Sequence, residues 1–162
     1  MVAFAANTKG RDSKRQGGGE IIAYPMTLST TIYKGDIVIV AVGTGLCKSL
    51  VADASVATGD FFAGVAAETK TAAASGTTYI NCYVTGTFEF LDNTDTVAVT
   101  DLGKVVEGDN SADATPSYVK YEGTGSHPNA VGVIQPPFVA AAGPVRVRID
   151  GYAGCAQLGV AP

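Results

Sequence analysis

Side chains able to perform acid–base or nucleophilic catalysis are few in this chain of 162 residues. His127 is the only histidine, and Ser126 immediately precedes it in a glycine-rich stretch that is typical of an exposed loop. A catalytic nucleophile needs a base within hydrogen-bond reach and a third group that orients the base, which two neighbouring residues do not provide. The sequence therefore predicts no catalytic residues, and we expect the protein not to be an enzyme.

One short segment resembles a phosphate-binding loop. It contains Gly43 and Gly45, followed by Cys47, Lys48 and Ser49. The phosphate-binding motif requires a glycine immediately before the lysine and four residues between its glycines. Cys47 occupies the position of that second glycine, so we interpret the segment as a turn and expect no nucleotide cofactor.

Two acidic stretches could offer oxygen ligands to a metal ion. They contain Asp92, Asn93 and Asp95, and Glu107, Asp109, Asn110 and Asp113. Neither follows the twelve-residue calcium-loop pattern with glycine at position six and glutamate at position twelve. Asp and Asn also favour turns, so we expect solvated turns and no bound metal.

Three cysteines, Cys47, Cys82 and Cys155, follow no pattern known for disulfide frameworks or zinc sites. We expect reduced thiols in a protein made in a cytoplasm, with Cys82 packed in the core.

The apolar start of the chain is too short for a secretion signal, and its basic residues follow it. The longest wholly apolar run, residues 37–42, is far shorter than the ~20 residues that a membrane span needs.

The composition favours β-structure, because Val outnumbers Leu by 19 to 6 and side chains branched at Cβ pack well on pleated sheets. The clearest strand covers residues 78–90, where inward and outward side chains alternate. Gly86 interrupts this strand on its inner face and predicts a bulge or a tight bend. The inner face is predicted to hold Ile80, Cys82, Val84, Phe88 and Phe90.

Further strands are predicted over short segments separated by turn residues. Residues 37–42 are apolar throughout, so we expect that strand to be covered on both faces. The remaining candidates are residues 61–66, 96–100, 104–107, 118–121, 130–134 and 144–150. Only residues 50–57 and 69–75 could form a helix, of one or two turns. The predicted fold is all-β: a single small barrel or sandwich over residues 20–162.

A weak internal repeat accompanies these strands. Gly64 and Val65 recur as Gly132 and Val133, and the alanine-rich stretch and strand that follow recur at offsets of 67 and 65 residues. Two similar β units closing on one core would explain the repeat. Chance in a chain rich in Ala, Gly and Val would explain it as well.

Residues 1–19 form a basic arm that ends in three glycines, which give it little conformational preference. The arm carries a net charge of +3, whereas residues 20–162 carry −7. An acidic body repels a phosphate backbone, so we expect no direct binding to nucleic acid. An arm that orders on a protein partner is favoured, although a solvated tail remains an alternative.

The order of short motifs resembles the head-decoration, or capsid cement, proteins of tailed bacteriophages. The similarity rests on Gly35-Asp36-Ile37-Val38, on Gly59-Asp60 followed by Gly64-Val65, and on Leu102-Gly103-Lys104-Val105 leading to Gly132-Val133. The similarity lies in the spacing of these motifs and in the chemical classes of their residues, and it covers roughly residues 33–150.

This resemblance implies a structural protein of the virion, made in the host cytoplasm. It would bind the major capsid protein on the outside of the expanded shell, often as a homotrimer, and stabilise the shell. We expect the arm to order on the capsid lattice, where its basic residues would meet acidic capsid residues. The capsid-binding residues would be Phe4, Lys9, Arg11, Lys14 and Arg15.

Two other classes remain open. A tail-tube, tail-fibre or baseplate component would have a similar composition. A carbohydrate-binding β module is the second alternative, with Tyr79 and Tyr83 as its best stacking platform, although the chain has no Trp. The same two tyrosines could equally pack across strands or against another subunit.

Overall fold

A computed structural model describes residues 19–50, 60–92, 98–109, 118–120, 130–136 and 144–150. It confirms the predicted all-β class. The strands are β1 (Ile21–Pro25), β2 (Thr31–Ile32), β3 (Ile37–Val40), β4 (Cys47–Ser49), β5 (Phe61–Ala66), β6 (Lys70–Thr71), β7 (Tyr79–Tyr83), β8 (Thr85–Asp92), β9 (Val105–Asp109), β10 (Tyr118–Lys120), β11 (Ala130–Gln135) and β12 (Pro144–Asp150). A short 3₁₀ turn, η2, covers Val99–Asp101. Within these ranges no helix is long and apolar enough to cross a membrane.

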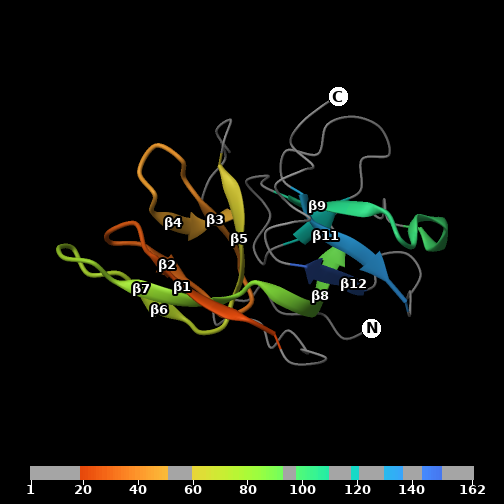
Figure 1. The fold of residues 1–162 in the computed structure, drawn as a ribbon, viewed down its shortest axis with the longest axis horizontal. Helices are drawn as coiled ribbons and strands as arrows, with labels where there is room; N and C mark the ends of the chain where they lie inside the picture. Colours follow the sequence, from red (N-terminus) through yellow and green to blue (C-terminus); the bar gives the residue numbers. More distant parts are fainter. Residues whose placement is uncertain are drawn as a thin grey trace.

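The strands are divided between two five-stranded units that lie side by side (Figure 1). The first unit is a sheet in the order β1-β7-β5-β3-β4, accompanied by the two-stranded ribbon β2-β6. The second unit is a closed ring in the order β10-β8-β12-β11-β9. The chain passes from the first unit to the second between β7 and β8, with one residue, Val84, between the two strands.

The two units repeat the same strand pairing. In the first unit Ile37 of β3 pairs with Val65 of β5, and in the second, 68 residues later in both strands, Val105 pairs with Val133. The register of both pairs then shifts by one residue at the same place. Beyond the shift, Ile39 pairs with Phe62, and 68 residues later Glu107 pairs with Ala130.

The remaining strands correspond in the same way. Ile22 of β1 pairs with Cys82 of β7, and its counterpart Phe88 pairs with Val147. The parallel contact that closes the second ring, Val119 with Asp92, has a counterpart in a single parallel bridge between Cys47 and Met26. The fold therefore contains two copies of one β unit, and the weak repeat in the sequence belongs to this duplication.

Two corresponding glycines allow neighbouring strands to approach closely. A Cβ on Gly64 would overlap the main-chain oxygen of Tyr83, and a Cβ on Gly132 would overlap the main-chain oxygen of Arg148. Both contacts lie where the central strand of a unit meets β7 or β12. Glycine is thus required at the same point of both units, which explains why Gly-Val is the part of the repeat visible in the sequence.

Strand β3 lies between two hydrophobic clusters. Val38 and Val40 face the interior of the first unit, whereas Ile37 and Ile39 face a cluster that also contains Phe88 and most of the interior of the second unit. All four residues are buried, which confirms that this apolar segment is covered on both faces. The strand ends at Val40, and Val42 beyond it is 60% exposed.

The alternating segment over residues 78–90 is divided between the two units. All five of its predicted inner residues are buried. However, Ile80, Cys82 and Val84 enter the first cluster, whereas Phe88 and Phe90 enter the second, because the chain changes sheets between β7 and β8. Gly86, where a bend was predicted, has a φ of 137°, in the region that favours glycine.

Several predicted elements are corrected by the structure. Residues 69–75 form no helix: they contain β6, whose Thr71 side chain shares a hydrogen bond with Thr31 across the ribbon. Residues 99 and 100, predicted as the end of a strand, belong to η2. Strands β1, β2 and β4 were not predicted. The possible helix over residues 50–57 lies outside the described residues except for Leu50, which is buried.

Candidate interaction surface

Most of the residues singled out for chemistry do not come together in the described structure. Several of them lie outside the described residues: His127, the possible oxygen ligands Asn93, Asp95, Asn110 and Asp113, and the arm residues Phe4, Lys9, Arg11, Lys14 and Arg15. Among the residues that are described, no three His, Cys, Asp or Glu side chains gather closely enough to hold a metal ion. The segment similar to a phosphate-binding loop was predicted to be a turn, but only its glycine-containing first part is one, since Cys47–Ser49 form β4. Lys48 there lies 3.9 Å from a carboxylate oxygen of Asp60.

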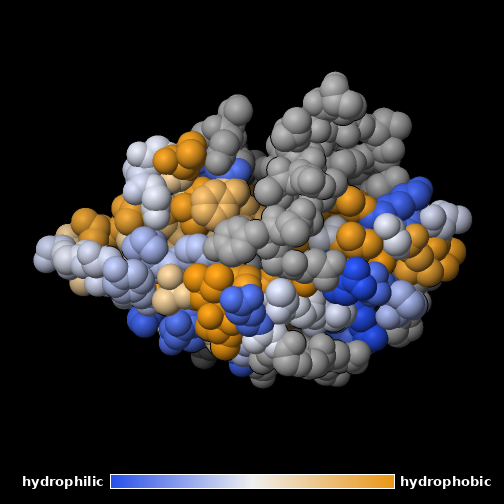
Figure 2. Space-filling model, viewed as in Figure 1, coloured by the Kyte–Doolittle hydropathy of each residue, from blue (hydrophilic) through white to orange (hydrophobic). Residues whose placement is uncertain are grey.

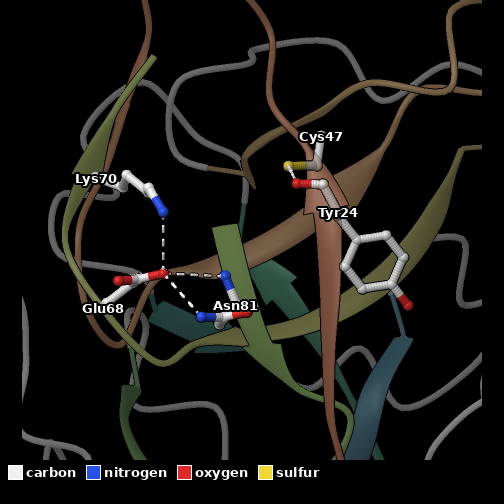
Figure 3. A network of polar contacts seen from close by, with 5 residues as sticks. All are labelled: Tyr24, Cys47, Glu68, Lys70 and Asn81. Atoms are coloured by element: carbon white, nitrogen blue, oxygen red, sulfur yellow. Dashed lines mark hydrogen bonds and ion pairs between the residues drawn. The ribbon is translucent and has the colours of Figure 1, made fainter. Parts of the chain in front are cut away.

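Two of the three cysteines are buried free thiols inside the first unit. The Cys47 sulfur lies 3.9 Å from the main-chain oxygen of Tyr24 (Figure 3). Burial raises the pKa of the Cys47 thiol to about 11. Burial, aided by the nearby Cys47 and Glu68, raises the pKa of the Cys82 thiol to about 12. Both groups are core side chains, as predicted for Cys82.

We expect both thiols to resist alkylation in the native protein. At pH 8 only about one thiol in a thousand would be ionised at Cys47 and one in ten thousand at Cys82, and the thiolate is the reactive form. In a Cys155→Ser variant, iodoacetamide should therefore label the native protein at least roughly a hundredfold more slowly than a free peptide thiol. Both cysteines should react readily in urea. Native labelling at the peptide rate would contradict the burial of these groups.

The outward face of β1 and β7 exposes two large hydrophobic side chains, Ile21 and Tyr79. Ile21, Ala23 and Pro25 of β1 stand opposite Tyr83, Asn81 and Tyr79 of β7. Ile21 is 49% exposed and Tyr79 is 52% exposed. We call the surface formed by Ile21, Ala23, Pro25 and Tyr79 the apolar face.

Tyr83 is not part of an exposed tyrosine pair. It is half-buried, and its ring packs against Phe88 with 5.8 Å between the ring centroids. Tyr83 thus joins the cluster that connects the two units. Tyr79 alone is exposed, so the two tyrosines do not provide the stacking platform considered from the sequence.

A small polar network borders the apolar face (Figure 3). One carboxylate oxygen of Glu68 accepts a hydrogen bond from the Asn81 side-chain amide at 3.1 Å and lies 3.5 Å from the Lys70 ammonium. The main-chain N–H of Asn81 also donates to this oxygen, at 3.4 Å. The network satisfies the polar groups at this position and leaves the neighbouring apolar side chains as the exposed part of the surface.

The corresponding face of the second unit is only partly apolar: Leu91 and Pro144 replace Pro25 and Tyr79, but the other positions are polar or charged. Thr87 and Glu89 of β8 replace Ile21 and Ala23, and Arg146 and Arg148 of β12 replace Asn81 and Tyr83. The Arg146 guanidinium lies 3.0 Å from the Glu89 carboxylate, and Arg148 is exposed. Strongly hydrophilic atoms gather in this half of the molecule, where Figure 1 draws β8 and β12 (Figure 2).

Sequence reasoning missed the apolar face because residues 20–35 read as a mixed, threonine-rich stretch. Every second side chain in this stretch is nevertheless large and points inward: Ile22, Tyr24 and Met26. The same period would have placed Ile21 and Ala23 on the outer side. No family model, curated protein or solved structure matches this chain.

Proposed function

We propose that this chain is a non-enzymatic structural protein of a tailed-phage virion, which binds the outer surface of the capsid and stabilises the shell. The observation that carries the proposal is the contrast between the two copies of the β unit. The second unit accommodates Thr87, Glu89 and two arginines on its outward face, so the fold itself does not require apolar residues at the positions of Ile21 and Ala23. The apolar face of the first unit is therefore available for contact with another protein.

The remaining support comes from charge and from the resemblance of the sequence to capsid cement proteins. Charged residues make up 16% of the chain, below the usual ~25%, which suits a protein that covers much of its surface with partners. A protein that binds only the expanded shell stabilises that state, and the stabilisation grows with the logarithm of the ratio of its free concentration to its Kd. At a concentration one hundred times the Kd it is about 2.7 kcal/mol for each site. The major capsid protein is the partner in this proposal.

Co-sedimentation with expanded phage heads that lack this protein tests the proposal. Four proteins are compared: the full chain, a chain that begins at Glu20, a Tyr79→Lys variant and a Val42→Lys variant as the matched control. Tyr79 and Val42 are similarly exposed, but only Tyr79 belongs to the apolar face. We expect saturable binding of the full chain and of Val42→Lys, with at least tenfold weaker binding of Tyr79→Lys.

The truncated chain then separates the two surfaces. Weaker binding of the chain that begins at Glu20 would assign part of the capsid contact to the basic arm, and that part should weaken further as salt is raised. Equal binding of both chains would assign the contact to the β units alone. Failure of every protein to bind would overturn the proposal, and assembly of the free protein into rings or tubes would then support a tail component instead.

A further inference from the structure

The outer edge of β1 presents main-chain groups that no described strand pairs with. Met26 donates its main-chain N–H to Thr78 of the neighbouring chain segment, and Val84 donates to Glu20, so the even-numbered residues of β1 bond toward β7. Odd-numbered residues therefore point their N–H and C=O groups toward the other edge. Thr27 confirms this direction, because its N–H donates to the main-chain oxygen of Cys47 in β4.

Two residues, Ile21 and Ala23, make up the part of this edge that is open in the described structure. At one end the chain continues into Glu20, which bonds away from this edge, since its N–H donates to the Thr85 hydroxyl at 2.8 Å. Pro25, which has no N–H to donate, bounds the other end. The edge thus offers two donors and two acceptors, and both side chains beside them are exposed.

The second unit protects the same edge. In the closed ring β10 pairs with β8 at Leu91 and Asp92, and the residues of β8 that correspond to Ile21 and Ala23, Thr87 and Glu89, lie outside this contact. A charged residue beside unpaired main-chain groups discourages pairing with another chain. The first unit has no charge at either position. One chain therefore contains a guarded and an unguarded version of the same strand edge, and the difference marks the unguarded one as an interface.

We propose that two copies of this protein pair through β1, antiparallel and centred on Ile22, so that the two sheets continue into one another. In this register Ile21 faces Ala23 of the second copy and Ala23 faces its Ile21. Each of these pairs exchanges two hydrogen bonds, so all four open main-chain groups of each copy are satisfied. The arrangement is two-fold symmetric and self-complementary, as closed dimers require.

A second copy fits this edge better than an unrelated strand does. The open part spans only three residues, which matches a pairing centred on its middle residue. The two-fold axis also sets the large Ile21 beside the small Ala23, and no like charges meet. The inference does not depend on the proposed function, because it concerns the free protein.

Register-specific disulfide formation tests the pairing. Ile21→Cys and Ala23→Cys are made separately, each with Cys155→Ser, while Cys47 and Cys82 stay buried and protonated. Residues in a hydrogen-bonded antiparallel pair have Cα atoms about 5.5 Å apart, within the range of a disulfide. We expect the mixture of the two variants to form a covalent dimer under mild oxidation, at least tenfold faster than either variant alone.

Analytical ultracentrifugation of uncrosslinked protein provides the second measurement. We expect a dimer for the full chain and for the Val42→Lys control, and a monomer for Ala23→Lys, with unchanged thermal unfolding of the monomeric units. Three results would each overturn the proposal: a full chain that is monomeric or trimeric, equal crosslinking of the single variants and the mixture, or a dimer that survives Ala23→Lys. Because no capsid is present, failure here leaves the capsid-binding proposal to be judged by its own experiment.

Discussion

Gly132→Ala is expected to lower the free energy of unfolding by about 3 kcal/mol or more, a large part of the 5–15 kcal/mol typical of a folded domain. The added Cβ would overlap the main-chain oxygen of Arg148 and lie 2.7 Å from a methyl group of Val147. Neither atom can move freely, because Arg148 and Val147 are paired with β11 and β8 inside the closed ring. The overlap could be removed only if β11 and β12 moved apart.

Urea unfolding followed by circular dichroism measures this effect, with two variants for comparison. Gly43→Ala is the control, since a Cβ there would meet nothing within 4 Å, and its free energy of unfolding should change by less than about 0.5 kcal/mol. Gly64→Ala, the counterpart in the first unit, should be as damaging as Gly132→Ala. If Gly132→Ala were as stable as Gly43→Ala, the close approach of β11 and β12 would be disproved.

Leu50→Ala is expected to cost about 3–5 kcal/mol, because Leu50 joins the two units. Leu50 is fully buried in the cluster that contains most of the interior of the second unit. Its side chain lies over Gly108 of β9, where a Cβ would overlap the Leu50 methyl group and lie 3.4 Å from Ile37. In the first unit the position of Gly108 is occupied by Val40. The glycine of the second unit therefore leaves open a space that the Leu50 side chain fills.

A double-mutant cycle tests this contact specifically. Gly108→Ala alone should cost about 1–3 kcal/mol by overpacking against Leu50. The double variant Leu50→Ala/Gly108→Ala should be more stable than the sum of the two losses predicts, because removing the leucine makes room for the new methyl group. Leu102→Ala, at an exposed position, is the control. Strictly additive losses would show that Leu50 and Gly108 do not touch.

Short apolar or alternating runs predicted several strands. Residues 61–66 and 144–150 were predicted with the bounds that β5 and β12 have in the structure. Strand β1 was missed because Pro25 and the following threonines obscure its alternation, and β4 because its three residues follow two turn glycines. Strands β1 and β4 lie at the edges of the first sheet, where short length and turn residues weaken any periodic signal.

The sequence by itself determined the all-β class and the buried side of the long alternating segment over residues 78–90, since alternation of side chains is a local property of the chain. Only the tertiary structure decided which core each residue enters: Val84 and Phe88 share one face of one predicted strand, yet they belong to different units. Pairing between distant strands decides this, and no local pattern encodes it. The same pairing turned a weak repeat of Gly64 and Gly132 into a duplicated fold, and it exposed Ile21 and Ala23 on an open edge.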